Sequence, residues 1–99
     1  ACYDKALEIN PEYVSAWFGK GLSFGKLGNY QESITCYDKT LEINSMDAKA
    51  WYNKALAEYK LSRRQDAVRS FKQFLELATE QHRKQIDYAR QRLRELEKG

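Results

Sequence analysis

Cysteine, histidine and proline are scarce in this sequence of 99 residues, which has two cysteines, one histidine and one proline. Two cysteines are too few for a disulfide-stabilised scaffold, and Cys2, Cys36 and His82 together cannot complete a four-ligand zinc site. We therefore expect no metal ion and no cofactor. Because a small secreted domain usually relies on several disulfides, the cysteine content favours a reducing compartment, the cytoplasm.

Long apolar runs are missing as well. No stretch approaches the roughly 18 apolar residues that a membrane-spanning helix requires, and residues 1–10 carry two acidic side chains, unlike a secretory signal. Hydrophobic residues nevertheless make up 42% of the chain and aromatic residues 13%. That content is too high for a disordered chain, so the composition predicts one folded, soluble domain without a membrane partner.

Two segments of the chain repeat each other at an offset of 34 residues. Residues 1–10 read ACYDKALEIN and residues 35–44 read TCYDKTLEIN, with eight identities in ten positions. The same offset relates Trp17 to Trp51. A fixed period of this length predicts a tandem array of small structural units that stack on one another.

The spacing of apolar residues indicates that each unit consists of two helices. Between Pro11 and Leu27 the apolar residues recur every three or four positions, and Gly28 follows as a helix-ending residue. Further helices are predicted over residues 30–43, 47–61, 65–78 and 80–98. The fold class is therefore all-α, a superhelix of about five helices, divided into the second helix of a truncated repeat (1–10), a first full repeat (11–45), a second full repeat (46–79) and a C-terminal capping helix (80–99).

The repeat resembles the tetratricopeptide repeat family, in which a helix-turn-helix unit of 34 residues stacks into a superhelix. Glu58 stands where the second unit is expected to have an aromatic residue, and Tyr59 follows it. The resemblance covers residues 1 to about 79 and implies a scaffold that binds other proteins and is not an enzyme. The matching residues are Trp17, Gly21, Phe24, Ser33, Tyr37 and Thr40 in the first full unit, and Trp51, Ala55, Tyr59, Ala67, Phe71 and Phe74 in the second.

The resemblance also implies a concave surface built from the first helix of each unit. Its mixture of aromatic, aliphatic and lysine side chains suits an extended peptide or a helix that carries apolar anchors and acidic neighbours. The implied lining residues are Ser15, Phe18, Gly19, Leu22, Gly25 and Lys26 from the first unit, and Lys49, Tyr52, Asn53, Leu56, Tyr59 and Lys60 from the second.

Part of this surface matches a clamp with which some members of the family hold the C-terminal carboxylate of a chaperone. Lys49 and Asn53 fit that clamp, whereas Phe18 and Gly19 stand where other clamp residues are expected. The resemblance therefore does not predict a chaperone partner.

No arrangement of residues in the sequence predicts catalysis. Trp17 and Trp51 recur on the apolar stripe, so we expect both to be core residues. Cys36 is expected to face outward, and no histidine or acid is spaced to activate it. His82 is expected to be a solvated surface residue.

Two alternatives to peptide binding remain open. Residues 60–99 hold 11 lysines and arginines against 6 acids, while residues 1–59 hold 6 against 8, so the C-terminal part is basic. This part could bind nucleic acid, although acids interrupt it and a solvated face is the commoner meaning. Alternatively, the array could recruit substrates for a larger enzyme. The basic residues in question are Arg63, Arg64, Arg69, Lys72, Arg83, Lys84, Arg90, Arg92 and Arg94.

The N-terminal segment begins inside a unit, which suggests a segment of a longer array. The helix expected over residues 1–10 would lack the neighbour that covers its apolar stripe. We therefore expect self-association through that helix, with the residues Tyr3, Ala6, Leu7 and Ile9 at the contact.

Overall fold

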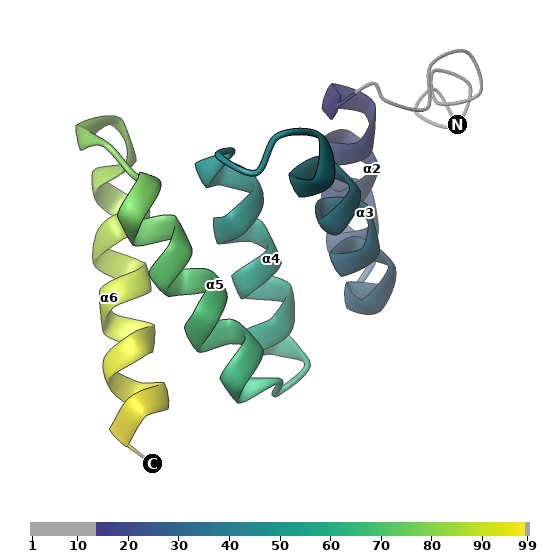
Figure 1. The fold of residues 1–99 in the computed structure, drawn as a ribbon. Helices are drawn as coiled ribbons and strands as arrows, with labels where there is room; N and C mark the ends of the chain where they lie inside the picture. The colour runs from purple at the N-terminus through teal and green to yellow at the C-terminus, as the bar shows by residue number, and fades with distance from the viewer. Residues whose placement is uncertain (1–13, 99) are drawn as a thin grey trace.

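A computed structural model describes residues 14–98, and these residues form five α-helices that stand in one row (Figure 1). The described part contains no strand, which confirms the all-α prediction. The helix expected over residues 1–10, and the self-association expected through it, lie outside the described residues. The helices are α2 (Val14–Lys26), α3 (Tyr30–Ile43), α4 (Ala48–Lys60), α5 (Arg64–Leu77) and α6 (Arg83–Lys98), with a short 3-10 turn, η1 (Glu80–His82), before α6.

The helices pack as two hairpins followed by a single helix. Helix α2 packs on α3, α4 packs on α5, and α3 packs on α4 to join the two hairpins. Helix α6 packs on α5 and forms one end of the row in Figure 1, while α2 and α3 form the other end. The predicted helix over residues 30–43 is confirmed, the helices α4 and α5 differ from their predicted bounds by one residue at each end, and the last helix starts with the η1 turn.

Both hairpin turns close in the same way. Gly28 has φ 81°, and after it the Asn29 N–H donates to the Phe24 carbonyl (2.9 Å) while the Gly28 N–H donates to the Gly25 carbonyl (3.1 Å). These two bonds are the Schellman motif, which uses a residue in the left-handed conformation to end a helix. Ser62, 34 positions later, occupies the same place in α4 with φ 61°. A serine there carries backbone strain that glycine does not.

The deepest part of the core lies between α4, α5 and α6. Phe71 and Phe74 are fully buried, and alanines on the two flanking helices allow the close packing around them. Burial of two whole phenylalanine rings contributes several kcal/mol to folding, at about 1.5 to 3 kcal/mol for each large apolar side chain. The buried residues of this cluster are Ala55, Ala67, Phe71, Phe74, Ala89 and Leu93.

Trp17 and Trp51 are half-buried, so the prediction that they are core residues is wrong in degree. Trp51 packs against the edge of the core cluster, its indole N–H donates to the Ser45 carbonyl (2.9 Å), and the Lys54 ammonium lies 5.2 Å from its ring centre. The indole therefore anchors the connection between α3 and α4. Periodicity identified the apolar stripe, but this ring lies at the edge of that stripe.

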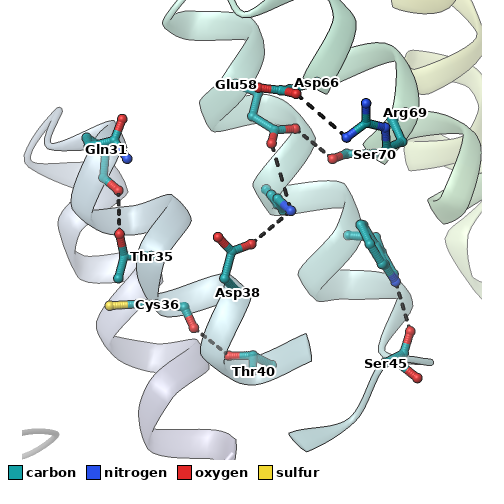
Figure 2. A network of polar contacts seen from close by, with 12 residues as sticks. Gln31, Thr35, Cys36, Asp38, Thr40, Ser45, Glu58, Asp66, Arg69 and Ser70 are labelled. Atoms are coloured by element: carbon teal, nitrogen blue, oxygen red, sulfur yellow. Dashed lines mark hydrogen bonds and ion pairs between the residues drawn. The ribbon is translucent and has the colours of Figure 1, made fainter. Parts of the chain in front are cut away.

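Cys36 is 3% exposed, and the prediction that it faces outward is wrong. It lies on α3, which packs against both α2 and α4, so two helices cover this face. Its backbone carbonyl accepts a hydrogen bond from the Thr40 hydroxyl (3.0 Å; Figure 2).

A buried carboxyl joins three helices near the middle of the row. Glu58 on α4 is 3% exposed, and the Ser70 hydroxyl on α5 donates a 2.6 Å hydrogen bond to it. The Lys54 ammonium lies 4.0 Å from the same carboxylate and 2.8 Å from Asp38 on α3 (Figure 2). Burial raises the pKa of Glu58, while the bond from Ser70 and the charge of Lys54 oppose that change.

The first hairpin depends on a glycine beneath an aromatic ring. Tyr37 on α3 is buried, and a Cβ placed on Gly21 of α2 would lie 2.6 Å from its ring carbon Cε1. The Ser33 hydroxyl also donates to the Gly21 carbonyl (2.6 Å), which holds the two helices at this separation. In the second hairpin the equivalent positions carry Ala55 and Phe71, both fully buried.

Replacement of Gly21 by alanine should destabilise the fold by about 1 to 3 kcal/mol, because the ring of Tyr37 has no free space into which it can move. Gly25→Ala is the matched control on the same helix, since its Cβ would meet only the Ser33 hydroxyl at an ordinary 3.5 Å. Removal of a helical glycine should stabilise that variant by about 0.5 to 1 kcal/mol. Urea unfolding followed by circular dichroism measures both, and equal effects would contradict the packing argument.

Ser62→Gly should stabilise the fold by about 0.5 to 1 kcal/mol, because glycine adopts a positive φ without strain. The reverse change at the equivalent turn, Gly28→Ser, should destabilise it by a similar amount. Thermal unfolding of the two variants gives the comparison. A loss of stability in Ser62→Gly would mean that the serine side chain contributes more than the strain costs.

Glu58→Gln should increase stability at neutral pH relative to the wild type. The folded-state pKa of Glu58 is raised above its ordinary value of 4.5, so the folded protein binds this proton more tightly than the unfolded chain does. Stability from this group is therefore present at low pH and is lost as pH rises from the ordinary pKa through the raised one. Glutamine still accepts from Ser70 and does not titrate, so the stability difference should grow with pH over that window and then level off. A glutamine variant that is less stable at every pH would show that the charge pair with Lys54 outweighs burial.

Candidate functional site

Two adjoining hollows lie between α2 and α4, and we call them together the groove. The first has a volume of about 370 Å³ and the second about 250 Å³, and Leu22 lines both. The first is lined by Val14, Ser15, Phe18, Gly19, Leu22, Asp47 and Lys49. The second is lined by Leu22, Gly25, Lys26, Tyr30, Ser33, Tyr37, Asn53, Leu56, Ala57 and Lys60.

Eight of the ten residues predicted for partner binding line these hollows. Ser15, Phe18, Leu22 and Lys49 lie in the first hollow. The second hollow holds Leu22 again and the remaining four, which are Lys26, Asn53, Leu56 and Lys60. The structure thus brings these residues together on one surface between two helices that are 34 residues apart in sequence.

Apolar side chains form the base of the groove. Leu22 is 37% exposed there, and the ring of Phe18 lies 5.8 Å from the ring of Tyr37. Burial raises the pKa of Tyr37, so its phenol stays protonated across the physiological range. An apolar side chain placed in this hollow would lose water contact against leucine and aromatic carbon.

Lysines form the rim. Lys26, Lys49 and Lys60 are exposed and make no ion pair with any residue of the described range 14–98. Asp47, also at the rim, is engaged in capping α4, because its carboxylate accepts the Ala50 N–H (3.2 Å). Asn53 donates its side-chain N–H to the Lys49 carbonyl of the same helix (2.9 Å). The rim is therefore cationic.

Tyr52 and Tyr59, the other two predicted residues, lie outside the groove. The ring of Tyr52 lies 4.9 Å from that of Phe74 and 6.3 Å from that of Tyr88, and its pKa is raised by burial and, to a smaller extent, by Tyr88. The Tyr59 hydroxyl accepts a hydrogen bond from Arg92 (3.3 Å). Helix α6 covers this side of α4, so both tyrosines belong to the contact between the two helices.

The sequence argument missed the contribution of the second helices. Tyr30, Ser33 and Tyr37 of α3 reach the second hollow from behind α2 and α4. Ser33 and Tyr37 lie one turn apart and were assigned to packing between helices, which they also perform. Their spacing on one face of α3 was the available signal.

His82 has a structural role instead of the solvated position that we expected. It is half-buried, its Nδ1 accepts the Thr79 N–H (3.2 Å), and its ring lies 5.9 Å from the ring of Phe74. These contacts cap the η1 turn. Within residues 14–98 no group of three or more potential ligands could hold a metal ion, and no helix there is long and apolar enough to cross a membrane.

The basic residues of the C-terminal part do not form one free cationic surface. Several of them pair with acids, as in Lys72–Glu97 (3.0 Å) and Arg92–Glu95 (3.1 Å). Arg64 donates to the Leu96 carbonyl (2.6 Å). This pairing weakens the case for nucleic-acid binding, which depends on cations that are free to meet phosphates.

Comparison with known proteins gives consistent matches. Residues 14–47 and residues 48–81 each match a family model described as the tetratricopeptide repeat (TPR). A segment of 31 residues is 48% identical to the uncharacterized protein MJ0572 of Methanocaldococcus jannaschii, and it makes up 31% of this chain and 36% of that protein. The match thus spans about a third of the length of that relative.

Several solved structures share the fold. The Arabidopsis OM64 TPR domain has a TM-score of 0.84 at 25% identity, over 94% of this chain and 75% of that one. The first TPR domain of Spaghetti (RPAP3), bound to the HSP90 peptide SRMEEVD, has a TM-score of 0.84 at 18% identity, over 98% and 73%. YrrB, described as a TPR protein with an unusual peptide-binding site, has a TM-score of 0.74 at 22% identity, over 81% and 41%.

Proposed function

Because the chain belongs to the tetratricopeptide repeat family, we propose that it is a protein–protein interaction module that binds a peptide or helix of a partner protein in the groove between α2 and α4. The observation that carries this proposal is an apolar hollow whose rim holds lysines without ion pairs. Such a surface gains energy from desolvated apolar contact at its centre and attracts acidic groups at its edge.

The size of the groove favours a peptide over a small molecule. Sites for drug-sized ligands typically enclose roughly 300 to 1,000 Å³ and bury most of the ligand, whereas the more apolar hollow measures about 250 Å³ and is open to solvent. It accommodates one or two side chains of a longer ligand. The adjoining hollow extends the surface along α2 and offers contact to neighbouring residues of the same ligand.

Relatives of the same fold support peptide binding. The Spaghetti domain holds an HSP90 peptide, and YrrB is described as having an unusual peptide-binding site. The lining residues differ from a carboxylate clamp at Phe18, so we propose a ligand that inserts an apolar side chain beside Leu22 and Leu56.

Leu22→Gln should weaken binding of selected peptides about five- to tenfold, because it places a polar group where the anchor side chain would lie. Leu61→Gln is the matched control, since Leu61 is 38% exposed against 37% for Leu22 and does not line the groove. Peptides for this test come from selection of a random phage-displayed library on the wild-type protein. Fluorescence anisotropy of the labelled peptides then gives the dissociation constants.

Failure to select any peptide would overturn the proposal. Unchanged affinity in Leu22→Gln, or equal losses in both variants, would place the binding surface elsewhere. Both substitutions replace an exposed side chain and should leave the melting temperature nearly unchanged.

A further inference from the structure

The 34-residue offset continues into α6, beyond the two matched repeats. Gly21 of α2, Ala55 of α4 and Ala89 of α6 are spaced by this offset, and all three are buried where helices meet. Helix α6 thus packs as the first helix of a third unit would. Its exposed side can therefore continue the surface that α2 and α4 begin.

Three cations recur with the same offset on that surface. Lys26, Lys60 and Arg94 are exposed and stand near the C-terminal ends of α2, α4 and α6. We call them the cation row. The fourfold recurrence of a small buried residue is not needed for this alignment, because the three buried positions above already fix the register of each helix.

A series of hollows joins the three cations. Lys26 and Lys60 line the second hollow of the groove. Lys60 also lines a wide depression of about 820 Å³ between α4 and α6, and Glu95 on its far side borders the hollow that Arg94 lines. A ligand that lies across the helices at this end would pass each cation in turn.

The charges of the cation row are available to a ligand. None of the three makes an ion pair with a residue of the described range, whereas Lys39 pairs with Glu42 (3.4 Å) and Lys72 pairs with Glu97 (3.0 Å). Glu95 borders the row, but it is paired with Arg92 at 3.1 Å. The row therefore favours an anionic ligand.

The separation of the helices sets the spacing of the anions. Packed helices lie about 8 to 10 Å apart, and a polyproline II chain advances about 9 Å in each turn of three residues. In that conformation every third side chain also points to the same side. Building on the proposed function, we propose that the partner presents an extended, polyproline II-like segment with an acidic residue at every third position, which crosses α2, α4 and α6 along the cation row.

Synthetic peptides of matched composition test this inference. One has glutamate at every third position among prolines and leucines, a second has the same residues with the glutamates consecutive, and a third has glutamine in place of glutamate. The wild-type protein should bind the first peptide about tenfold more tightly than the other two. Its binding should weaken as salt rises, because exposed charges are screened.

Two triple variants separate the cation row from net charge. Lys26→Ala, Lys60→Ala and Arg94→Ala together should weaken binding of the first peptide about tenfold and reduce its salt dependence. Lys39→Ala, Arg69→Ala and Lys72→Ala remove the same number of lysines and arginines from α3 and α5, and should change affinity less than about twofold.

The outcomes distinguish this inference from the proposed function. Equal binding of spaced and consecutive glutamates, or equal losses in the two triple variants, would overturn the inference. Binding of library-selected peptides that depends on Leu22, with no binding of the spaced glutamate peptide, would overturn the inference and leave the groove function standing. If neither kind of peptide binds, both proposals are wrong.

Discussion

The contact on which the structure depends is the close approach of paired helices at one small residue in each first helix. At Gly21 the ring of Tyr37 leaves no space for a methyl group, and at Ala55 the surrounding core includes the fully buried Phe71. Because protein interiors are close-packed, these contacts leave little freedom in how each pair of helices lies. They also fix which faces of α2 and α4 turn toward each other. The groove is therefore a consequence of how the core packs.

Contacts between units are different in kind from contacts within them. Within units the buried groups are mostly apolar, whereas Lys54 and Asp38 (2.8 Å) join α4 to the preceding α3 by a charge pair that is partly exposed. Exposed ion pairs contribute about 0 to 1 kcal/mol each. Stacking of the units must therefore rest mainly on the helix surfaces, with polar pairs such as Arg63 with Gln31 selecting the register. Glu58 shows the cost of placing such a group deeper, because burial raises its pKa.

The period of the sequence predicted most of the fold, because the same spacing of residues must produce the same helix in each unit. It predicted the helix bounds closely and placed residues such as Leu22 and Leu56 on the groove. It could not predict depth of burial, which depends on how far other helices extend over a face. Cys36 is buried because two helices cover α3, and Trp51 is half-buried because its indole reaches the connection at Ser45.

The misplaced tyrosines bear on what the surface can bind. Tyr52 and Tyr59 have the right position in the repeat to line a groove, but α6 packs over them, and Arg92 lies 5.8 Å from the ring of Tyr59. The same helix that removes these rings from the surface carries Arg94 on an exposed side. Aromatic contact is therefore replaced by positive charge from α4 to α6. A ligand that follows the row meets an apolar hollow at Leu22 first and cations afterwards, so its own sequence must change in the same order, from an apolar anchor to acidic residues.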